Sequence, residues 1–200
     1  MRLNPSADAS TRDSARPARP RTVLVVEDTP EDREVIERLL RRFPEASYEV
    51  KAAAVGGEGL AAIRAGLATG TPPDCVLLDF HLPDMTALEF LERVADEMPE
   101  GAPPAAVGVG GATRLPLPIV VLTGTAQRLE PAVQSLQRGA LDYLSKSAVT
   151  PVTLHRAIES ALERFEAARQ LEEQRVLLAR QNRSLDAAAA RTARLLGAAT

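Results

Sequence analysis

The chain has 200 residues, of which 45% are hydrophobic and 26% charged, as is typical of a globular domain with some additional elements. Its net charge of −3 gives no general electrostatic reason to bind nucleic acid, and no run approaches the roughly 18 apolar residues that a membrane span needs. The single cysteine, Cys75, excludes an intrachain disulfide and favours a reduced, cytoplasmic setting.

Residues 1–21 contain Pro, Ser, Asp and Arg and almost no apolar side chains, which predicts a disordered leader. The segment has no apolar stretch of the kind found in a secretory signal. Four arginines, at positions 12, 16, 19 and 21, leave a nucleic-acid-binding arm as an alternative. A solvated tail is the favoured interpretation.

From residue 22 onward, short apolar runs that suit strands alternate with segments of helical periodicity. The expected strands are residues 22–27, 48–52, a run ending at 79, a run ending at 123, and 141–144. The expected helices are residues 30–43, 58–68, 87–96 and 127–137. This alternation predicts an α/β domain over residues 22–150, with a five-stranded parallel sheet covered by helices on both faces. In the flavodoxin-like strand order 2-1-3-4-5, the first and third strands are neighbours.

Residues 98–118 interrupt this pattern with five prolines and four glycines. Loops in such folds usually have about 2–6 residues. We therefore expect a flexible insertion before the fourth strand. A tolerated surface insertion is favoured over a loop that binds a partner.

A long helix is expected over residues 151–196, with Thr150 as N-cap and Pro151 at the first helical position. Its beginning should pack on the sheet, whereas a single sheet cannot cover the remainder. In that remainder leucines recur every seven residues, at positions 171, 178 and 185. The spacing favours a coiled coil that forms a homodimer over a solvated single helix.

Five polar side chains follow or end the apolar runs: Glu27 and Asp28 after the first, Asp79 at the third, Thr123 at the fourth and Lys146 after the fifth. The carboxyl ends of parallel strands meet at one edge of a sheet. Three carboxylates there favour Mg²⁺. A carboxylate is also a nucleophile for acyl phosphate formation, and the ammonium and hydroxyl groups can stabilise the transferred charge. The pattern indicates a metal-assisted phosphoryl-acceptor site.

Residues 21–167 resemble a bacterial response-regulator receiver domain. The resemblance rests on the motifs VVED, LLDFHLPDMTALEFL, VVLTG and GALDYLSK. It implies that a histidine kinase or a phosphotransfer protein donates a phosphoryl group to Asp79. The resemblance further implies that Mg²⁺ is bound by Asp28, Asp79 and the backbone carbonyl of His81, and by Glu27 mainly through water. Thr123 and Lys146 would contact the phosphoryl group. Tyr143 would change its rotamer as Thr123 moves.

One departure from the family is Ser147, which follows Lys146 where such domains usually have proline. The isomer of that peptide bond is therefore left open. The His81 side chain, two residues after Asp79, is expected to be exposed rather than to act as a base or as a relay histidine.

The expected function is that of a response regulator whose phosphorylation switches protein–protein interactions, and not that of an enzyme. Two alternatives remain. One is a scaffold of the same fold that works without phosphorylation. The other is an aspartyl-phosphate phosphatase, although such enzymes usually place a second acid where this chain has His81.

Overall fold

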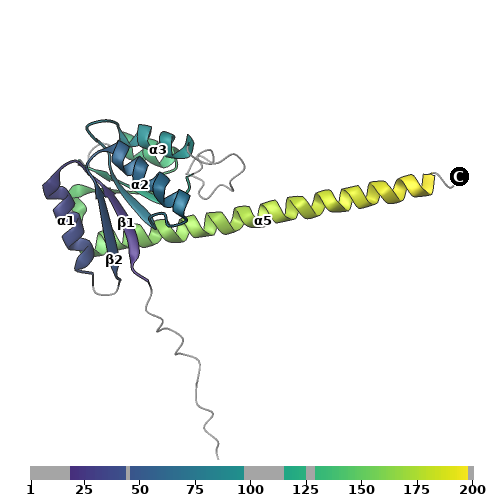
Figure 1. Cartoon of the computed structure of the whole chain (residues 1–200), viewed down its shortest axis with the longest axis horizontal. Helices are drawn as coiled ribbons and strands as arrows, with labels where there is room; N and C mark the ends of the chain where they lie inside the picture. Colours follow the sequence, from purple (N-terminus) through teal and green to yellow (C-terminus); the bar gives the residue numbers. More distant parts are fainter. Residues whose placement is uncertain (1–18, 44–45, 97–114, 125–128, 198–200) are drawn as a thin grey trace, which may run out of the picture.

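The computed structural model describes residues 19–43, 46–96, 115–124 and 129–197. Five strands form one sheet in these residues: β1 (Arg21–Val26), β2 (Tyr48–Ala53), β3 (Cys75–Asp79), β4 (Ile119–Thr123) and β5 (Asp142–Ser145). The α-helices are α1 (Pro30–Arg41), α2 (Gly56–Thr69), α3 (Ala87–Asp96), α4 (Leu129–Gln137) and α5 (Pro151–Gly197) (Figure 1). The strands pair in parallel in the order β2-β1-β3-β4-β5, as predicted.

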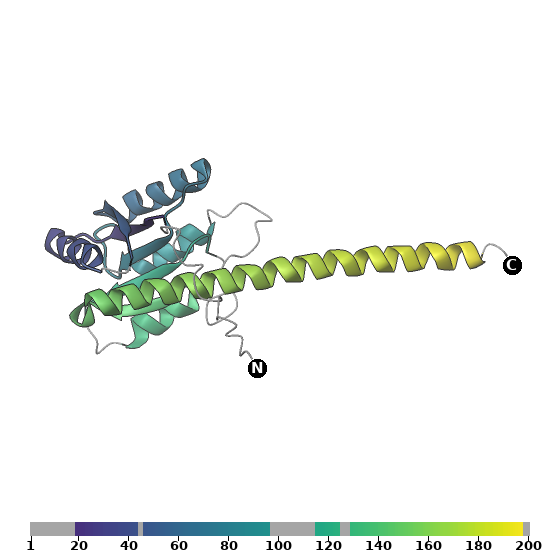
Figure 2. The same ribbon diagram turned by 90° about the horizontal axis from the view of Figure 1, so that it is seen from below.

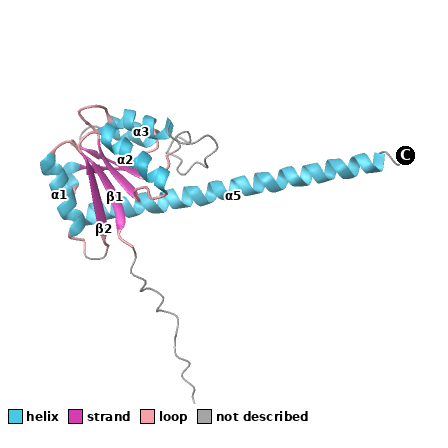
Figure 3. Cartoon of the chain, in the orientation of Figure 1, coloured by secondary structure: helices cyan, strands magenta, loops and turns pink. Residues whose placement is uncertain are grey.

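Helices cover both faces of the sheet (Figures 2 and 3). Side chains of α1 and the beginning of α5 pack on one face, around Val25, Leu77 and Ile158. Those of α2 and α3 pack on the other, around Val26 and Leu78. Every residue of β3 and β4 is buried, which is why these strands appear in the sequence as continuous apolar runs rather than as alternating patterns.

Helix α2 begins at Gly56, two residues before the start that the periodicity predicts. Its N-cap residue, Val55, makes no capping hydrogen bond through its side chain. The carboxylate of Asp84, in the loop after β3, accepts hydrogen bonds instead from the backbone N–H groups of Gly56 and Gly57, each at 2.8 Å. The start of α2 is thus set by a residue distant in sequence, because those N–H groups have no partner within the helix.

Two expected loop segments fall mostly outside the described residues, namely the leader and the insertion of residues 98–118. At the end of the leader, Arg21 already belongs to β1, and Arg19 pairs with Asp74 at 2.6 Å. At the end of the insertion, Leu115 and Leu117 are 0% and 2% exposed and belong to the core. The last residues of both segments are therefore part of the packed domain.

Helix α5 has 47 residues, which corresponds to a length of about 70 Å. Thr150 caps it as predicted: its hydroxyl accepts from the Thr153 N–H at 3.1 Å, and the Thr153 hydroxyl accepts from the Thr150 N–H at 2.8 Å. Phe165 is the last hydrophobic side chain of α5 that packs against the cluster on this face of the sheet. The rest of the helix projects away from the domain (Figure 1). No helix in the described part of the chain is long and apolar enough to cross a membrane.

The beginning of α5 is also held by a cluster that the sequence did not predict. The ring of His155 stacks on that of Phe43, with centroids 3.8 Å apart. Its Nδ1 lies 2.5 Å from the hydroxyl of Tyr48 in a hydrogen bond. These contacts tie α5 to the end of α1 and the start of β2.

Candidate functional site

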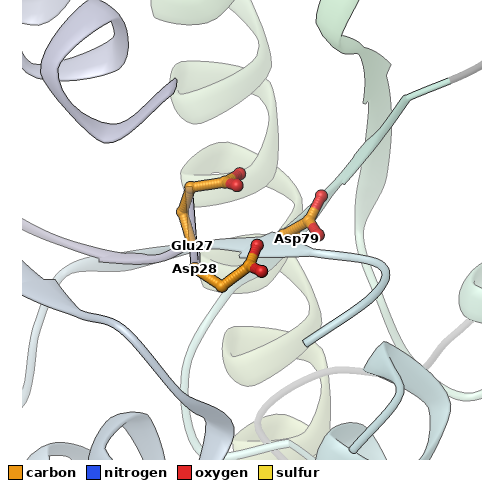
Figure 4. A group of neighbouring side chains, drawn as sticks. All are labelled: Glu27, Asp28 and Asp79. Atoms are coloured by element: carbon orange, nitrogen blue, oxygen red, sulfur yellow. The ribbon is translucent and has the colours of Figure 1, made fainter. Parts of the chain in front are cut away.

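Three carboxylates meet at the carboxyl edge of the sheet (Figure 4). Glu27 and Asp28 directly follow β1, and Asp79 is the last residue of β3. The two strands are neighbours, with Val26 paired to Leu78. One carboxylate oxygen from each acidic residue lies within 4.8 Å of the others. The structure therefore brings these three predicted residues together.

Glu27 is the most buried of the three, with 0% of its surface exposed. Burial raises the pKa of Glu27; the Lys146 ammonium lowers it, the negative charge of Asp79 raises it further, and the net shift is upward. Its Oε2 is buried and lies 2.7 Å from Lys146 Nζ in an ion pair. A buried oxygen of this kind, beside two more carboxylates, fits a hard divalent cation such as Mg²⁺.

Lys146 follows β5 and points into the acidic cluster. Its Nζ lies 2.7 Å from Glu27 Oε2, 2.9 Å from Asp79 Oδ1 and 3.0 Å from Asp32 Oδ2. Partial burial lowers the pKa of Lys146, but the hydrogen bonds to the three carboxylates outweigh burial and raise it. The ammonium is therefore charged and balances part of the negative charge.

Asp32 is a site residue that the sequence reasoning missed. It lies in the first turn of α1. The sequence feature that could have identified Asp32 is its position four residues after Asp28, in the first turn of the helix that follows β1. Arg33 holds this turn in place, since its guanidinium donates to the backbone carbonyls of Glu27 and Asp28, the latter at 3.0 Å.

Asp79 is 5% exposed and uses both of its carboxylate oxygens. Oδ1 contacts Lys146, and Oδ2 accepts a hydrogen bond from the His81 N–H at 3.1 Å. The loop after β3 is closed by the Ala87 N–H, which donates to the Phe80 carbonyl at 2.9 Å. The side chain of His81 is exposed, as predicted. Metal binding by its carbonyl oxygen stays a prediction.

The remaining predicted residues lie on the two adjacent strands. Thr123 ends β4, directly beside β3, and is 8% exposed. Among the described residues, a Cβ placed on the following Gly124 would meet no heavy atom within 4 Å. Tyr143, in β5, is 40% exposed. The Lys146–Ser147 peptide is trans, since the described residues contain no cis peptide bond.

This arrangement of a doubly wound sheet, an acidic cluster and a lysine agrees with comparison to known proteins. Residues 23–159 match the family model of the response regulator receiver domain. The chain belongs to this family.

Among curated relatives, it is 33% identical over 132 residues to a protein-glutamate methylesterase/protein-glutamine glutaminase of Gluconobacter oxydans, covering 65% of this chain and 31% of that protein. It is 33% identical over 127 residues to the probable transcriptional regulatory protein TcrX of Mycobacterium tuberculosis, covering 64% of this chain and 44% of the relative. The chain thus spans less than half of the length of these two relatives.

Solved structures give the same fold. A putative response regulator from Chloroflexus aurantiacus superposes with a TM-score of 0.56 at 29% identity, over 72% of this chain and 99% of that one. The chemotaxis response regulator CheY4 of Vibrio cholerae superposes with a TM-score of 0.52 at 26% identity, over 71% and 98% of the two chains.

Proposed function

We propose that this chain is a phosphoryl acceptor of a two-component system, with Asp79 as the residue that is modified by a histidine kinase or a phosphotransfer protein. The observation that carries the proposal is the contact between Asp79 Oδ1 and Lys146 Nζ at 2.9 Å, beside two further carboxylates at the same sheet edge. The family match supports it. In this role the chain is a signalling protein that catalyses only its own phosphorylation and dephosphorylation.

In the proposed reaction an Asp79 carboxylate oxygen forms a bond to phosphorus while the bond between phosphorus and the donor atom breaks, and the donor leaves with that electron pair. Asp28, Asp79 and the His81 carbonyl, with Glu27 mainly through water, would hold Mg²⁺, which would supply positive charge for the phosphoryl oxygens. Lys146, whose ammonium lies 2.9 Å from Asp79 Oδ1, contributes a second positive charge. Thr123 donates a hydrogen bond to the phosphoryl group.

Phosphorylation adds a charge of about −1.5 to −2, by analogy with other phosphorylated residues. We propose that Thr123 and Lys146 then move toward the phosphoryl group and that Tyr143 changes its rotamer. The partial exposure of Tyr143 leaves space for this change. The surface formed by α4, β5 and α5 is then altered, and with it the binding of a protein partner.

The proposed partner of α5 is a second copy of the chain. Beyond the domain, Leu171, Leu178 and Leu185 are 51%, 57% and 67% exposed. Most of the stability of helices in proteins comes from packing of an apolar face rather than from intrinsic propensity. The seven-residue spacing would bring these leucines onto one side of a coiled coil. Pairing would remove their apolar surface from water.

Two neighbouring leucines allow a matched test of this dimer. Leu177 and Leu178 are 56% and 57% exposed, but only Leu178 belongs to the seven-residue repeat. Leu178→Glu should therefore convert the dimer to a monomer in light scattering, whereas Leu177→Glu should leave it a dimer. The same measurement with beryllofluoride, a phosphoryl mimic, shows whether phosphorylation strengthens or weakens pairing. A monomeric wild-type chain in both states would exclude dimerisation as the output.

The phosphoryl-acceptor role is tested with a phosphotransfer screen against the histidine kinases of the host. At least one kinase should label the wild-type chain, and Asp79→Asn should not be labelled. Failure of every kinase and of acetyl phosphate to label the wild-type chain would favour a scaffold without phosphorylation. We propose a cytoplasmic location, as expected from the single cysteine in the sequence.

A further inference from the structure

The three carboxylates that contact Lys146 are not equivalent. Glu27 and Asp79 belong to the acidic cluster that suits a divalent cation. Asp79 in addition gives up a carboxylate oxygen when it forms an acyl phosphate. Asp32 lies outside that cluster, with 44% of its side chain exposed, and comes from a different element, α1.

The position of Asp32 is fixed by the backbone around it. Pro30 opens α1, and the Arg33 N–H donates to the Thr29 carbonyl at 3.1 Å. The Arg33 guanidinium donates hydrogen bonds to the backbone carbonyls of Glu27 and Asp28, which follow β1. Asp32 therefore faces Lys146 from a helical turn that hydrogen-bonds to the backbone of Glu27 and Asp28, directly after β1.

Lys146 has three N–H donors and, in this structure, three carboxylates within 3.0 Å. If Glu27 helped to hold a cation and Asp79 formed the acyl phosphate, the ammonium would lose two of these three carboxylate partners. One phosphoryl oxygen can take up one donor. Asp32 is then the only remaining carboxylate of the three that keeps its full negative charge for Lys146.

We propose that Asp32 is a positioning residue, which holds the Lys146 ammonium toward Asp79 during phosphoryl transfer. This inference rests on the proposed function of Asp79 and Lys146. Asp32 makes no contact with the reacting atoms in this proposal and acts through Lys146. Without it, the flexible lysine side chain would spend less time facing the phosphoryl group, and transfer would slow down.

The test compares Asp32→Asn with Glu31→Gln. Both substitutions remove one negative charge from the first turn of α1, but Glu31 is an exposed residue outside the site. With acetyl phosphate and Mg²⁺ at fixed concentrations, Asp32→Asn should be phosphorylated about three- to fivefold more slowly, the size expected for one partly exposed ion pair. Glu31→Gln should react at the wild-type rate, and Asp32→Glu should recover most of the lost rate.

A second readout does not depend on the reaction. The side-chain ammonium signal of Lys146 in ¹⁵N NMR should persist during a Mg²⁺ titration of the wild-type chain and of Glu31→Gln, and it should broaden beyond detection in Asp32→Asn. Equal rates and equal signals in Asp32→Asn and the wild type would overturn the role of Asp32, as would faster phosphorylation of Asp32→Asn. Labelling of Asp79→Asn would instead overturn the proposed function itself.

Discussion

Replacing Lys146 by methionine tests the electrostatics of the site in the absence of any metal. Methionine keeps much of the aliphatic volume of lysine but removes the charge that faces Glu27, Asp32 and Asp79. Glu27 is 0% exposed, so its ionised carboxylate would be left buried without a cation. We expect the variant to have a lower free energy of unfolding in EDTA at pH 7.

Two limits set the size of this effect. Breaking a buried ion pair by removing one partner typically costs about 3–5 kcal/mol. The Lys146 side chain is 22% exposed, so water reduces that cost. Glu27 can also avoid a buried charge by taking up a proton. At pH 7, protonation costs an ordinary glutamate side chain about 3 kcal/mol. The raised pKa of Glu27 makes this protonation easier. The expected loss is therefore about 2–3 kcal/mol.

Urea unfolding at several pH values measures this loss. Because Glu27 is neutral at low pH, the deficit of Lys146→Met should shrink as the pH falls toward 4.5, the ordinary glutamate value, and grow as the pH rises. Saturating Mg²⁺ should also reduce it. The matched control is Lys51→Met, at an exposed position on β2, which should change stability by less than about 0.5 kcal/mol. A Lys146→Met chain as stable as the wild type in EDTA at pH 7 would refute the reasoning.

Four further variants test packing and helix capping, each by urea unfolding. Gly59→Ala should lower the free energy of unfolding by about 1 kcal/mol, because its Cβ would lie 2.8 Å from Val26 Cγ2 and overpacking outweighs the helix propensity gained. Gly57→Ala, whose Cβ meets Asp84 Oδ2 at 3.4 Å, should instead be neutral or stabilising; the reverse order of the two variants would contradict this account. Asp84→Ala should cost about 1 kcal/mol at pH 7 as the loss of a helix cap. Burial raises the pKa of Asp84, but the hydrogen bonds from the backbone N–H groups of Gly57 and Gly56 lower it, and the net shift is downward. The cost should therefore vanish only as the pH falls below 3.8 through the lowered pKa, and a cost that persisted at lower pH would exclude this origin. Ile158→Ala should cost about 3 kcal/mol, since Ile158 is 0% exposed between α5 and the sheet, and a cost near zero would mean that α5 is not docked there.

The sheet could be predicted from the sequence because its central strands are buried on both faces. The runs that end at Asp79 and Thr123 are apolar without alternation, which indicates parallel strands beneath two helical layers. Once the strands are parallel, their carboxyl ends share an edge. The meeting of Glu27, Asp28 and Asp79 therefore follows from the parallel pairing and the strand order, whereas Lys146 follows β5 and reaches them with its long side chain from beyond β4.

What the sequence did not reveal depends on contacts between elements distant in the chain. Asp32 reaches Lys146 across 114 positions, and this contact depends on where α1 begins beside the sheet. Asp84 determines the start of α2 from 28 residues away. Leu115 belongs to the core although it follows a segment rich in proline and glycine. Local periodicity carries no information about such contacts.

Asp79 is the proposed acceptor of the phosphoryl group. An acyl phosphate is reduced by borohydride, so a phosphorylated aspartate is converted to homoserine, whereas a free carboxylate is left unchanged. After treatment with acetyl phosphate and Mg²⁺ and then borohydride, mass spectrometry of the peptides should find homoserine at position 79. The untreated chain and Asp79→Asn should contain none. Homoserine at Asp28 or at another aspartate, or an unmodified Asp79 in a chain that carries phosphate, would contradict the account.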